Sequence, residues 1–232
     1  MPWLIAIVAA VILAHIAPFP FLLDTTDHTL WRMPATVPPA IYLTFDDGPN
    51  PTATPQLLDV LRKHEVSATF FVLDRHLTRE TLPILRRTFE EGHAVALHSH
   101  SRRLMFAGWA VVATTLQEAA ARIEVWTGYQ TCRAFRPHDG YRSVPMLMGA
   151  ARAGYTVVGW GWMLSDFNWF RRKTADALVP RLLARASPGD IIAIHDGHHQ
   201  NLRANRLYAV ETVDRVIPEL KARGFEFGTI CP

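Results

Sequence analysis

Short apolar runs alternate with longer amphipathic segments from residue 40 to the end of the chain. Leu57, Leu58 and Leu61, for example, form the apolar stripe of a helix. The pattern predicts strands at 41–45, 68–73, 94–97, 133–135, 156–160, 190–194 and 225–230, and helices at 55–63, 82–91, 113–126, 144–152, 174–186 and 207–222. This α/β alternation of about seven strand–helix units predicts a mainly parallel sheet that is closed or nearly closed into a barrel, with a doubly wound open sheet as the alternative architecture.

The first 23 residues follow a different pattern. No Asp, Glu, Lys or Arg occurs from Pro2 to Leu23. A helix over residues 3–17 covers roughly 22 Å, which is shorter than the ~30 Å hydrocarbon core, but a helix continued through Pro18 and Pro20 is long enough to span it. We therefore expect 1–23 to be an uncleaved membrane anchor. An atypical signal peptide is the second interpretation of this segment, and a buried N-terminal helix is the third. The expected location is membrane-anchored or exported, with the catalytic domain facing the cell envelope or periplasm.

Proline spacing and composition set the domain organisation. Residues 24–39, with mixed polarity and several prolines, are expected to be a linker, and 40–232 a single folded domain. The net charge is only +3 and the basic residues are scattered, so nucleic acid is not an expected partner. Cys132 and Cys231 either pair or remain two buried thiols. The oligomeric state is left open.

Polar side chains follow several of the predicted strands. In a parallel barrel these positions meet at the carboxyl ends of the strands, where the chemistry of such folds gathers. A carboxylate and an imidazole are suited to Zn²⁺ or another divalent ion, and a second carboxylate beside them can act as a base. The residues concerned are Asp46 and Asp47 after the first strand, His98 after the third, Arg136 after the fourth, Asp166 and Trp169 beyond the fifth, and His195 and Asp196 after the sixth.

The ordered motifs resemble those of the polysaccharide deacetylases, carbohydrate esterase family 4 with the NodB-homology domain. The resemblance covers residues 40 to 232, and its motifs are Thr44-Phe45-Asp46-Asp47-Gly48-Pro49, His98-Ser99, Arg136-Pro137, the Asn168-Trp169 region and Ile194-His195-Asp196. It implies a distorted (β/α) barrel and a divalent metal, most often zinc, that serves the hydrolysis of an N-acetyl group on a sugar.

The resemblance also implies roles for individual residues. The metal is expected on Asp47 and His98, with Asp46 as the base and His195 as the acid. Supporting roles are expected for Arg136, which keeps Asp46 ionised, Asp166, which tunes His195, Asp139, whose backbone N–H faces the oxyanion, and Trp169 and His138, which contact the substrate.

Position 102 departs from the family pattern. The family places a second metal-binding histidine four residues after the first, and here that residue is Arg102. A guanidinium has no lone pair for a cation and repels it. His100 is the candidate third ligand, and His138, Asp139, His198 and His199 are further candidates from neighbouring loops.

These features predict a metal-dependent hydrolase that removes N-acetyl groups from an amino-sugar polymer or oligosaccharide. Two alternatives stay open. Arg102 favours a carbohydrate-binding pseudoenzyme that has lost its metal, and the apolar residues 1–23 favour a deacylase or deformylase of a lipid-linked sugar.

Overall fold

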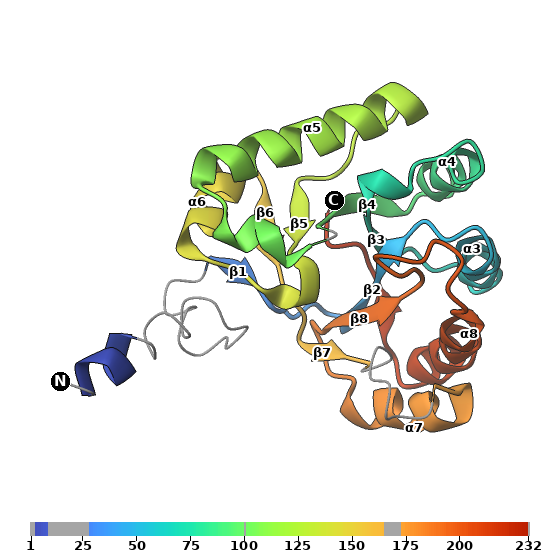
Figure 1. Ribbon diagram of the computed structural model, residues 1–232. Coiled ribbons are helices and arrows are strands. Elements are labelled where there is room, and N and C mark those ends of the chain that lie inside the picture. The colour runs from blue at the N-terminus through green and yellow to red at the C-terminus, as the bar shows by residue number, and fades with distance from the viewer. Residues whose placement is uncertain (1–2, 9–27, 100, 165–172, 232) are drawn as a thin grey trace.

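Parallel strands form a curled half-barrel, with the helices packed around its outside (Figure 1). The computed structural model describes residues 3–8, 28–99, 101–164 and 173–231. The strands are β1 Thr29–Leu30, β2 Ala40–Gly48, β3 Thr69–Val72, β4 Ala94–His98, β5 Ala134–Arg136, β6 Thr156–Val158, β7 Trp162–Met163, β8 Ile191–His195 and β9 Glu226–Phe227. The helices are α3 Ala53–Lys63, α4 Leu82–Glu90, α5 Trp109–Thr127, α6 Val144–Arg152, α7 Ala175–Arg185 and α8 Leu207–Ala222, with short 3₁₀ turns at η1 Asp74–His76, η2 Arg102–Phe106 and η3 His138–Gly140.

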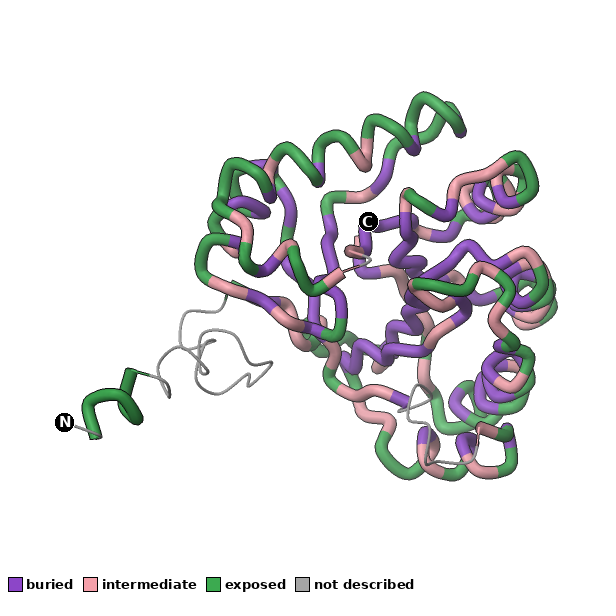
Figure 2. The backbone as a smooth tube through the Cα atoms, in the orientation of Figure 1, coloured by how far each residue is buried: buried purple, intermediate pink, exposed green. Residues whose placement is uncertain are grey.

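Strand β2 is the centre of the sheet. The strand order is β1-β6-β5-β4-β3-β2-β8-β7, with β9 paired to the start of β2, and every pairing between these strands is parallel. All nine residues of β2 are buried, because β3 and β8 flank it and helices cover its outer side (Figure 2). The predicted α/β barrel-like fold is therefore confirmed, and helices on the outside of a curled sheet distinguish it from the doubly wound alternative.

Helix amphipathicity produces the main core. The apolar stripe predicted for α3 is buried through Leu57, Leu58 and Leu61, against strand residues such as Phe45 and Phe70. Burying each such side chain contributes roughly 1.5–3 kcal/mol. This layer between helices and sheet holds the strands rigid and thereby fixes where their carboxyl ends lie.

The segment predicted as a linker differs in part from that expectation. Residues Thr29 and Leu30 form the edge strand β1 beside β6, and the chain then crosses to β8, where Met33 N–H donates to Gly189 O at 2.9 Å. Arg32 bridges Asp190 at 3.1 Å. A two-residue strand is too short for a periodic signal, and its residues pair only because the rest of the sheet offers an open edge.

Several predicted boundaries were also wrong by a few residues. The strand predicted at 156–160 ends at Val158, and Gly159 then lies so close to the Trp31 ring that a Cβ would stand 2.3 Å from it. The last strand, predicted at 225–230, is only Glu226–Phe227, and β7 was not predicted at all. Short strands depend on pairing partners that are distant in sequence, which a local pattern does not contain.

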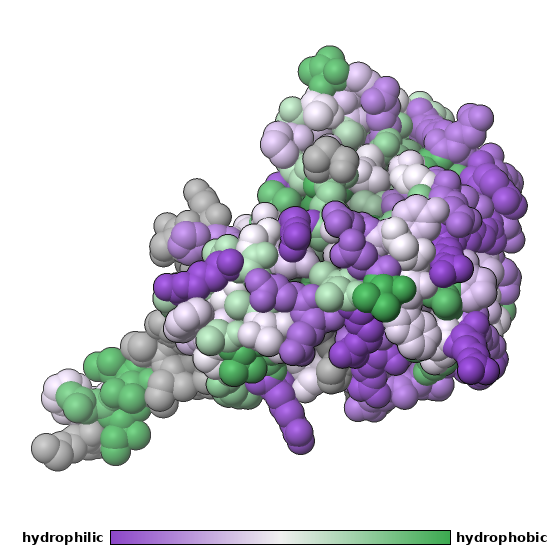
Figure 3. All heavy atoms as spheres, turned by 90° about the horizontal axis from the view of Figure 1, so that it is seen from above, coloured by the Kyte–Doolittle hydropathy of each residue, from purple (hydrophilic) through white to green (hydrophobic). Residues whose placement is uncertain are grey.

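Residues 3–8 are helical, and their apolar side chains are exposed, with Trp3 at 65% and Ile5 at 71% of full exposure. Figure 3 shows these residues as mostly green, hydrophobic spheres. Within the described residues, no helix combines the length and the hydropathy that a membrane span requires. Residues 9–23 of the predicted anchor lie outside the described residues.

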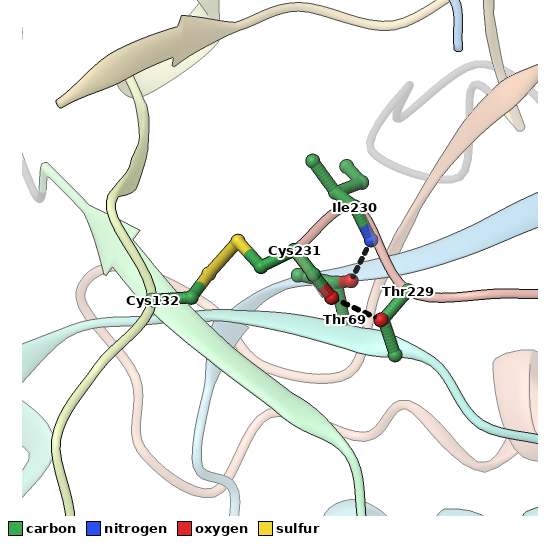
Figure 4. Close-up of a disulfide and its surroundings, with 5 residues drawn as sticks. All are labelled: Thr69, Cys132, Thr229, Ile230 and Cys231. Carbon is green, nitrogen blue, oxygen red and sulfur yellow. Dashed lines mark hydrogen bonds between the residues drawn. A yellow bond between two sulfur atoms is a disulfide. The ribbon is translucent and has the colours of Figure 1, made fainter. Parts of the chain in front are cut away.

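The two cysteines form a disulfide. Cys132 precedes β5 and Cys231 lies near the end of the chain, with their Cα atoms 6.1 Å apart (Figure 4). The neighbouring Ile230 N–H donates to the Thr69 hydroxyl of β3 at 2.9 Å, and the Thr229 hydroxyl donates to the Cys231 carbonyl. The segment after β9 is thus fastened across β3 and the start of β5. The sequence had left pairing and two free thiols as equal alternatives.

Candidate active site

A cleft of about 840 Å³ opens where the carboxyl ends of β2, β4, β5 and β8 meet. Its lining contains most of the polar residues that the sequence placed after successive strands. They are Asp46, Asp47, His98 and His195, and they are joined by Arg102, His138, Asp139, Trp160, His198, His199 and Arg206. These four strand-end residues thus lie at one cleft, whereas Arg136 and Asp196 are buried and do not line it.

Asp46 and Arg136 form a buried ion pair at the floor of the cleft. Arg136 Nη1 lies 2.6 Å from Asp46 Oδ1, and the arginine side chain has 0% exposure. The same nitrogen donates to the Thr44 hydroxyl at 2.7 Å, while Nη2 donates to Gly159 O at 2.8 Å and the guanidinium lies 4.0 Å from the Phe71 ring centre. A guanidinium held on this many sides fixes the orientation of the Asp46 carboxylate.

The ends of β2 and β8 interlock through two glycines. A Cβ at Gly197 would stand 2.0 Å from Asp47 O, and one at Gly48 would stand 2.5 Å from Asp196 Oδ2. Asp47 itself has a φ of 69°, in the left-handed region that few residues other than Gly, Asn and Asp adopt. The tight contact between these two strand ends therefore needs glycine at both positions, which gives a structural reason for Gly48 and Gly197.

His98 is oriented to present a lone pair to Asp47. Its Nδ1 lies 2.7 Å from Arg136 O, which only accepts, so Nδ1 carries the proton. Nε2 therefore faces Asp47 Oδ1, at 3.5 Å. That carboxylate oxygen is buried and has no hydrogen-bond partner among the described residues. Two ligands ~2.1 Å from one tetrahedral ion lie roughly 3.4 Å apart, so the pair fits a shared divalent cation.

Two further imidazoles approach the same carboxylate. Asp47, His138 and His199 each offer a ligand atom within 4.8 Å of the other two. His138 Nδ1 is buried and has no hydrogen-bond partner within the described part of the chain. Sequence reasoning included both histidines among several open candidates and assigned His138 to the substrate. The sequence could not show that these two histidines lie beside Asp47. Both are on loops, and hydrophobic periodicity does not predict the path of a loop.

Arg102 turns away from these ligands toward Asp139. Its Nε and Nη2 lie 2.7 and 2.6 Å from the same Asp139 Oδ2, and its guanidinium covers the Tyr141 ring at 4.7 Å. The hydrogen bond and charge of Asp139 raise the pKa of Arg102, with partial burial acting in the other direction. The expected repulsion of a cation by this arginine is therefore offset by a carboxylate in direct contact.

Asp139 also has an unusual backbone. Its φ of 52° lies in the left-handed region, inside the turn η3 that directly follows Arg136-Pro137. Aspartate tolerates this conformation better than most residues, and such conformations recur at functional sites. The turn brings the Asp139 backbone and carboxylate to the wall of the cleft.

His195 and Asp196 end strand β8. His195 is the register partner of Asp46 and lines the cleft, so the predicted acid and base come from neighbouring strands. Asp196 is buried beside them, and it accepts a hydrogen bond from the Thr54 hydroxyl at 2.5 Å. Burial raises the pKa of Asp196 to about 7; Thr54 lowers it, and the charges of Asp46 and Asp47 raise it further.

The histidines also affect the ionisation of the metal-ligand candidates. For Asp47, burial acts to raise the pKa, but nearby His98, His195, His138 and His199 act together to lower it, and the net shift is downward. Burial lowers the pKa of His138 to about 4, against the opposing charge of Asp139. At neutral pH the site thus presents a carboxylate and a neutral imidazole, which are the forms that bind a cation.

Three predicted site residues, His100, Asp166 and Trp169, lie outside the described residues. Trp160, which follows β6, does line the cleft, 6.0 Å from the Arg136 guanidinium and edge-on to Trp31. It is an aromatic wall of the cleft that the sequence did not separate from ordinary core aromatics.

The chain is similar in sequence to proteins described as deacetylases. The sequence profile described as polysaccharide deacetylase matches residues 34–158. A chitooligosaccharide deacetylase of Sinorhizobium fredii is 37% identical over 193 residues, covering 81% of this chain and 88% of that protein.

Solved structures agree in fold. A peptidoglycan N-acetylglucosamine deacetylase in complex with an N-oxidanyl-benzamide ligand superposes with a TM-score of 0.76 at 26% identity, covering 92% of this chain and 95% of that one. A mutant of a Bacillus anthracis pseudoenzyme of the CE4 family, described as having restored activity, gives a TM-score of 0.73 at 25% identity over 90% of this chain and 72% of its own.

Proposed function

Because the chain belongs to the polysaccharide deacetylase family, we propose that it is a metal-dependent hydrolase of N-acetyl groups on amino-sugar units. The single observation that carries the proposal is the pairing, on one cleft floor, of a buried Asp46–Arg136 ion pair with a carboxylate–imidazole pair at 3.5 Å. The first supplies a fixed base, and the second supplies ligands for a divalent ion. The substrate class is an N-acetylated glycan of the kind that the similar deacetylases are named for.

Asp46 acts as the base. Its ion pair with Arg136 fixes its orientation and the residue lines the cleft, so its carboxylate can take a proton from a water molecule that attacks the acetyl carbon. A divalent cation, zinc being the best match to one carboxylate and imidazoles, supplies Lewis acidity toward water and the amide carbonyl when bound. Asp47 and His98 are the residues that hold it.

His195 acts as the acid. The departing sugar nitrogen needs a proton, and an imidazole one strand away from the base is placed to donate it. The backbone N–H of Asp139 is the proposed donor to the developing oxyanion, since its turn stands at the cleft wall. Asp166 is proposed to tune His195 and Trp169 to contact the sugar, both on the basis of the family resemblance alone.

The pseudoenzyme alternative depended on Arg102 as a cation in the ligand set. Its contact with Asp139, at 2.6 Å, weakens that argument, because the guanidinium is neutralised and turned aside. The lipid-linked alternative depended on residues 1–23, of which 9–23 lie outside the described residues, so it has no separate support.

The test is the change Asp46→Asn. The amide keeps the size of the side chain and removes the base, so acetate release from N-acetylated chitooligosaccharides in the presence of zinc should fall roughly 10²–10⁴-fold. Asp214→Asn, in α8 and outside the cleft lining, is the matched control and should keep its activity. Unchanged turnover in Asp46→Asn, or no turnover by zinc-loaded wild type, contradicts the proposal.

We further propose that residues 40–232 form the catalytic domain and that this domain faces an oxidising compartment such as the periplasm or cell envelope. The Cys132–Cys231 disulfide supports that location, because structural disulfides persist outside the reducing cytosol. Alkylation of both thiols in protein taken directly from cells, without reductant, would count against it.

A further inference from the structure

We propose that His138 and His199 complete a four-residue cation site with Asp47 and His98, and that Asp139 holds Arg102 out of it. The inference deepens the proposed function and assumes only that the cleft binds a divalent ion. It replaces the second histidine that the family carries at position 102 with imidazoles from two other loops. The argument rests on proximity, on unpartnered buried atoms and on the proton positions of the histidines.

Proximity selects His138 and His199 from the remaining histidines. Their ligand atoms and one of Asp47 lie within 4.8 Å of one another, and the two rings meet edge to face with centres 4.5 Å apart. His98 approaches Asp47 from β4 at 3.5 Å, and its ring centre is 6.1 Å from that of His138. Asp47 of β2 is thus shared by two contacts, one with His98 of β4 and one with the group formed by His138, in the turn after β5, and His199, in the loop after β8.

Two buried atoms without hydrogen-bond partners indicate which kind of ligand this part of the cleft can bind. Asp47 Oδ1 and His138 Nδ1 are both buried, and neither has a hydrogen-bond partner among the described residues. Leaving such groups unsatisfied is unfavourable, and more so for a charged group. A cation bound by both atoms removes that cost.

Asp139 orients His138 as well as Arg102. Its Oδ2 lies 3.5 Å from His138 Nε2 and 2.6 Å from Arg102 Nη2. A carboxylate beside one ring nitrogen leaves the other nitrogen for a metal, an arrangement that fixes the tautomer and the ring orientation of metal-binding histidines. One carboxylate therefore prepares a ligand and neutralises the arginine that stands where the family has a ligand.

His198 is not one of the proposed metal ligands, although it is the sequence neighbour of His199. Its Nδ1 accepts the backbone N–H groups of Gln200 and Asn201 at 3.1 and 3.2 Å, so the neutral ring carries its proton on Nε2 and has no second lone pair to give. Its ring stacks on His199 at 4.6 Å. His198 thus shapes the loop and supports His199 without binding the ion.

The chemistry of this set favours zinc. Three imidazoles and one carboxylate suit Zn²⁺, and Co²⁺ can substitute as a spectroscopic probe, whereas Mg²⁺ and Ca²⁺ prefer all-oxygen sites. We therefore expect one zinc ion per chain, with Mg²⁺ unable to compete for it at comparable concentrations.

The test measures zinc affinity by competition with a chromophoric chelator, and the Co²⁺ absorption spectrum, on purified full-length chain. His199→Ala is the leading variant, because the residue is only partly buried and its loss should not impair folding. We expect its zinc affinity to fall by about 10–100-fold or more and its Co²⁺ spectrum to change. His138→Asn is the second variant, with the same expectation.

His198→Asn is the matched control. An asparagine oxygen can accept the same two backbone N–H groups, so this variant removes the neighbouring imidazole and keeps the loop. It should bind zinc within about two-fold of wild type. Wild-type affinity and spectra in both His199→Ala and His138→Asn would overturn the inference.

The outcomes separate this inference from the proposed function. If His199→Ala and His138→Asn retain zinc and the zinc-loaded wild type deacetylates, the four-residue site is wrong and the function stands. If both variants lose zinc but the loaded wild type releases no acetate, the site stands and the proposed function fails.

Discussion

Two arginine–aspartate pairs lie at the same cleft and differ almost completely in environment. Arg136 and Asp46 are both buried, with side-chain exposures of 0% and 5%, and the arginine contacts two strands besides its own. Arg102 and Asp139 are 59% and 40% exposed and lie on adjacent loops at the rim. The N···O distance is 2.6 Å in both.

The difference teaches that equal geometry does not mean equal energy. An exposed pair contributes about 0–1 kcal/mol, because water competes for both charges. A buried pair is costly to assemble, but removing one partner is much more costly, because the other charge is left without solvent. The Arg136–Asp46 pair at the cleft floor is thus coupled to folding. The Arg102–Asp139 pair at the rim can act on ligand binding with little effect on stability.

Arg136→Ala should show the largest effect. It leaves the Asp46 carboxylate buried and unpaired, so the free energy of unfolding should fall by about 3–5 kcal/mol, and hydrolysis should be lost. Urea unfolding followed by circular dichroism measures the first and acetate release the second. Arg102→Ala is the matched stability control, and equal losses in the two variants would erase the distinction between floor and rim.

Asp196, buried at the end of β8, sharpens the comparison because burial dominates its pKa and no arginine among the described residues pairs with it. Its folded-state pKa of about 7 lies above its unfolded value of 3.8, so the native state holds a proton that the unfolded state has lost between those pH values. Asp196 therefore lowers stability as pH rises through this window, by up to ~1.4 kcal/mol per pH unit.

Asp196→Asn should remove that slope, because the amide does not titrate and can still accept from Thr54. The measurement is the free energy of unfolding at pH 5 and pH 7.5 in wild type and variant. Asp214 should have the opposite effect on stability. Its pKa is lowered, chiefly by the hydrogen bond from Lys63, so its contribution to the free energy of unfolding is lost as pH falls. Parallel pH profiles in wild type and Asp196→Asn would contradict the assignment.

The rim pair should give the smallest change in stability. Asp139→Asn is expected to alter the free energy of unfolding by less than about 1 kcal/mol. It should weaken zinc binding by roughly five-fold, on the order of 1 kcal/mol, because Arg102 then carries an uncompensated charge near the ion. The double variant with Arg102→Ala should recover part of that loss. Additive effects of the two changes would mean that the pair does not act as a unit.

The floor of the cleft could be predicted from sequence because its residues belong to strands. Asp46, Arg136 and His195 each follow an apolar run, and parallel strands place such residues at one end. The pairing of Arg136 with Asp46, at 2.6 Å, follows the expectation taken from the family resemblance.

The rim could not be predicted in the same way. Arg102 was expected to oppose a cation, yet it is directed to Asp139, which lies 37 residues further along the chain. The positions of His138 and His199 depend on loop paths, and β1 depends on a free sheet edge that appears only after β6 has formed. These features are set by tertiary contacts, and no local period of hydrophobicity records them.

The interlocked glycines have a consequence for how such a cleft can diversify. Because Gly48 and Gly197 leave no room between the ends of β2 and β8, their close contacts with the Asp196 side chain and the Asp47 carbonyl fix the spacing of the residues that surround the bond to be broken. Ser101, Lys173 and Gln200 stand on the rim in three separate loops and share no such constraint. Mutational drift in those loops can therefore reshape the entrance for a different glycan while the reaction geometry stays as it was.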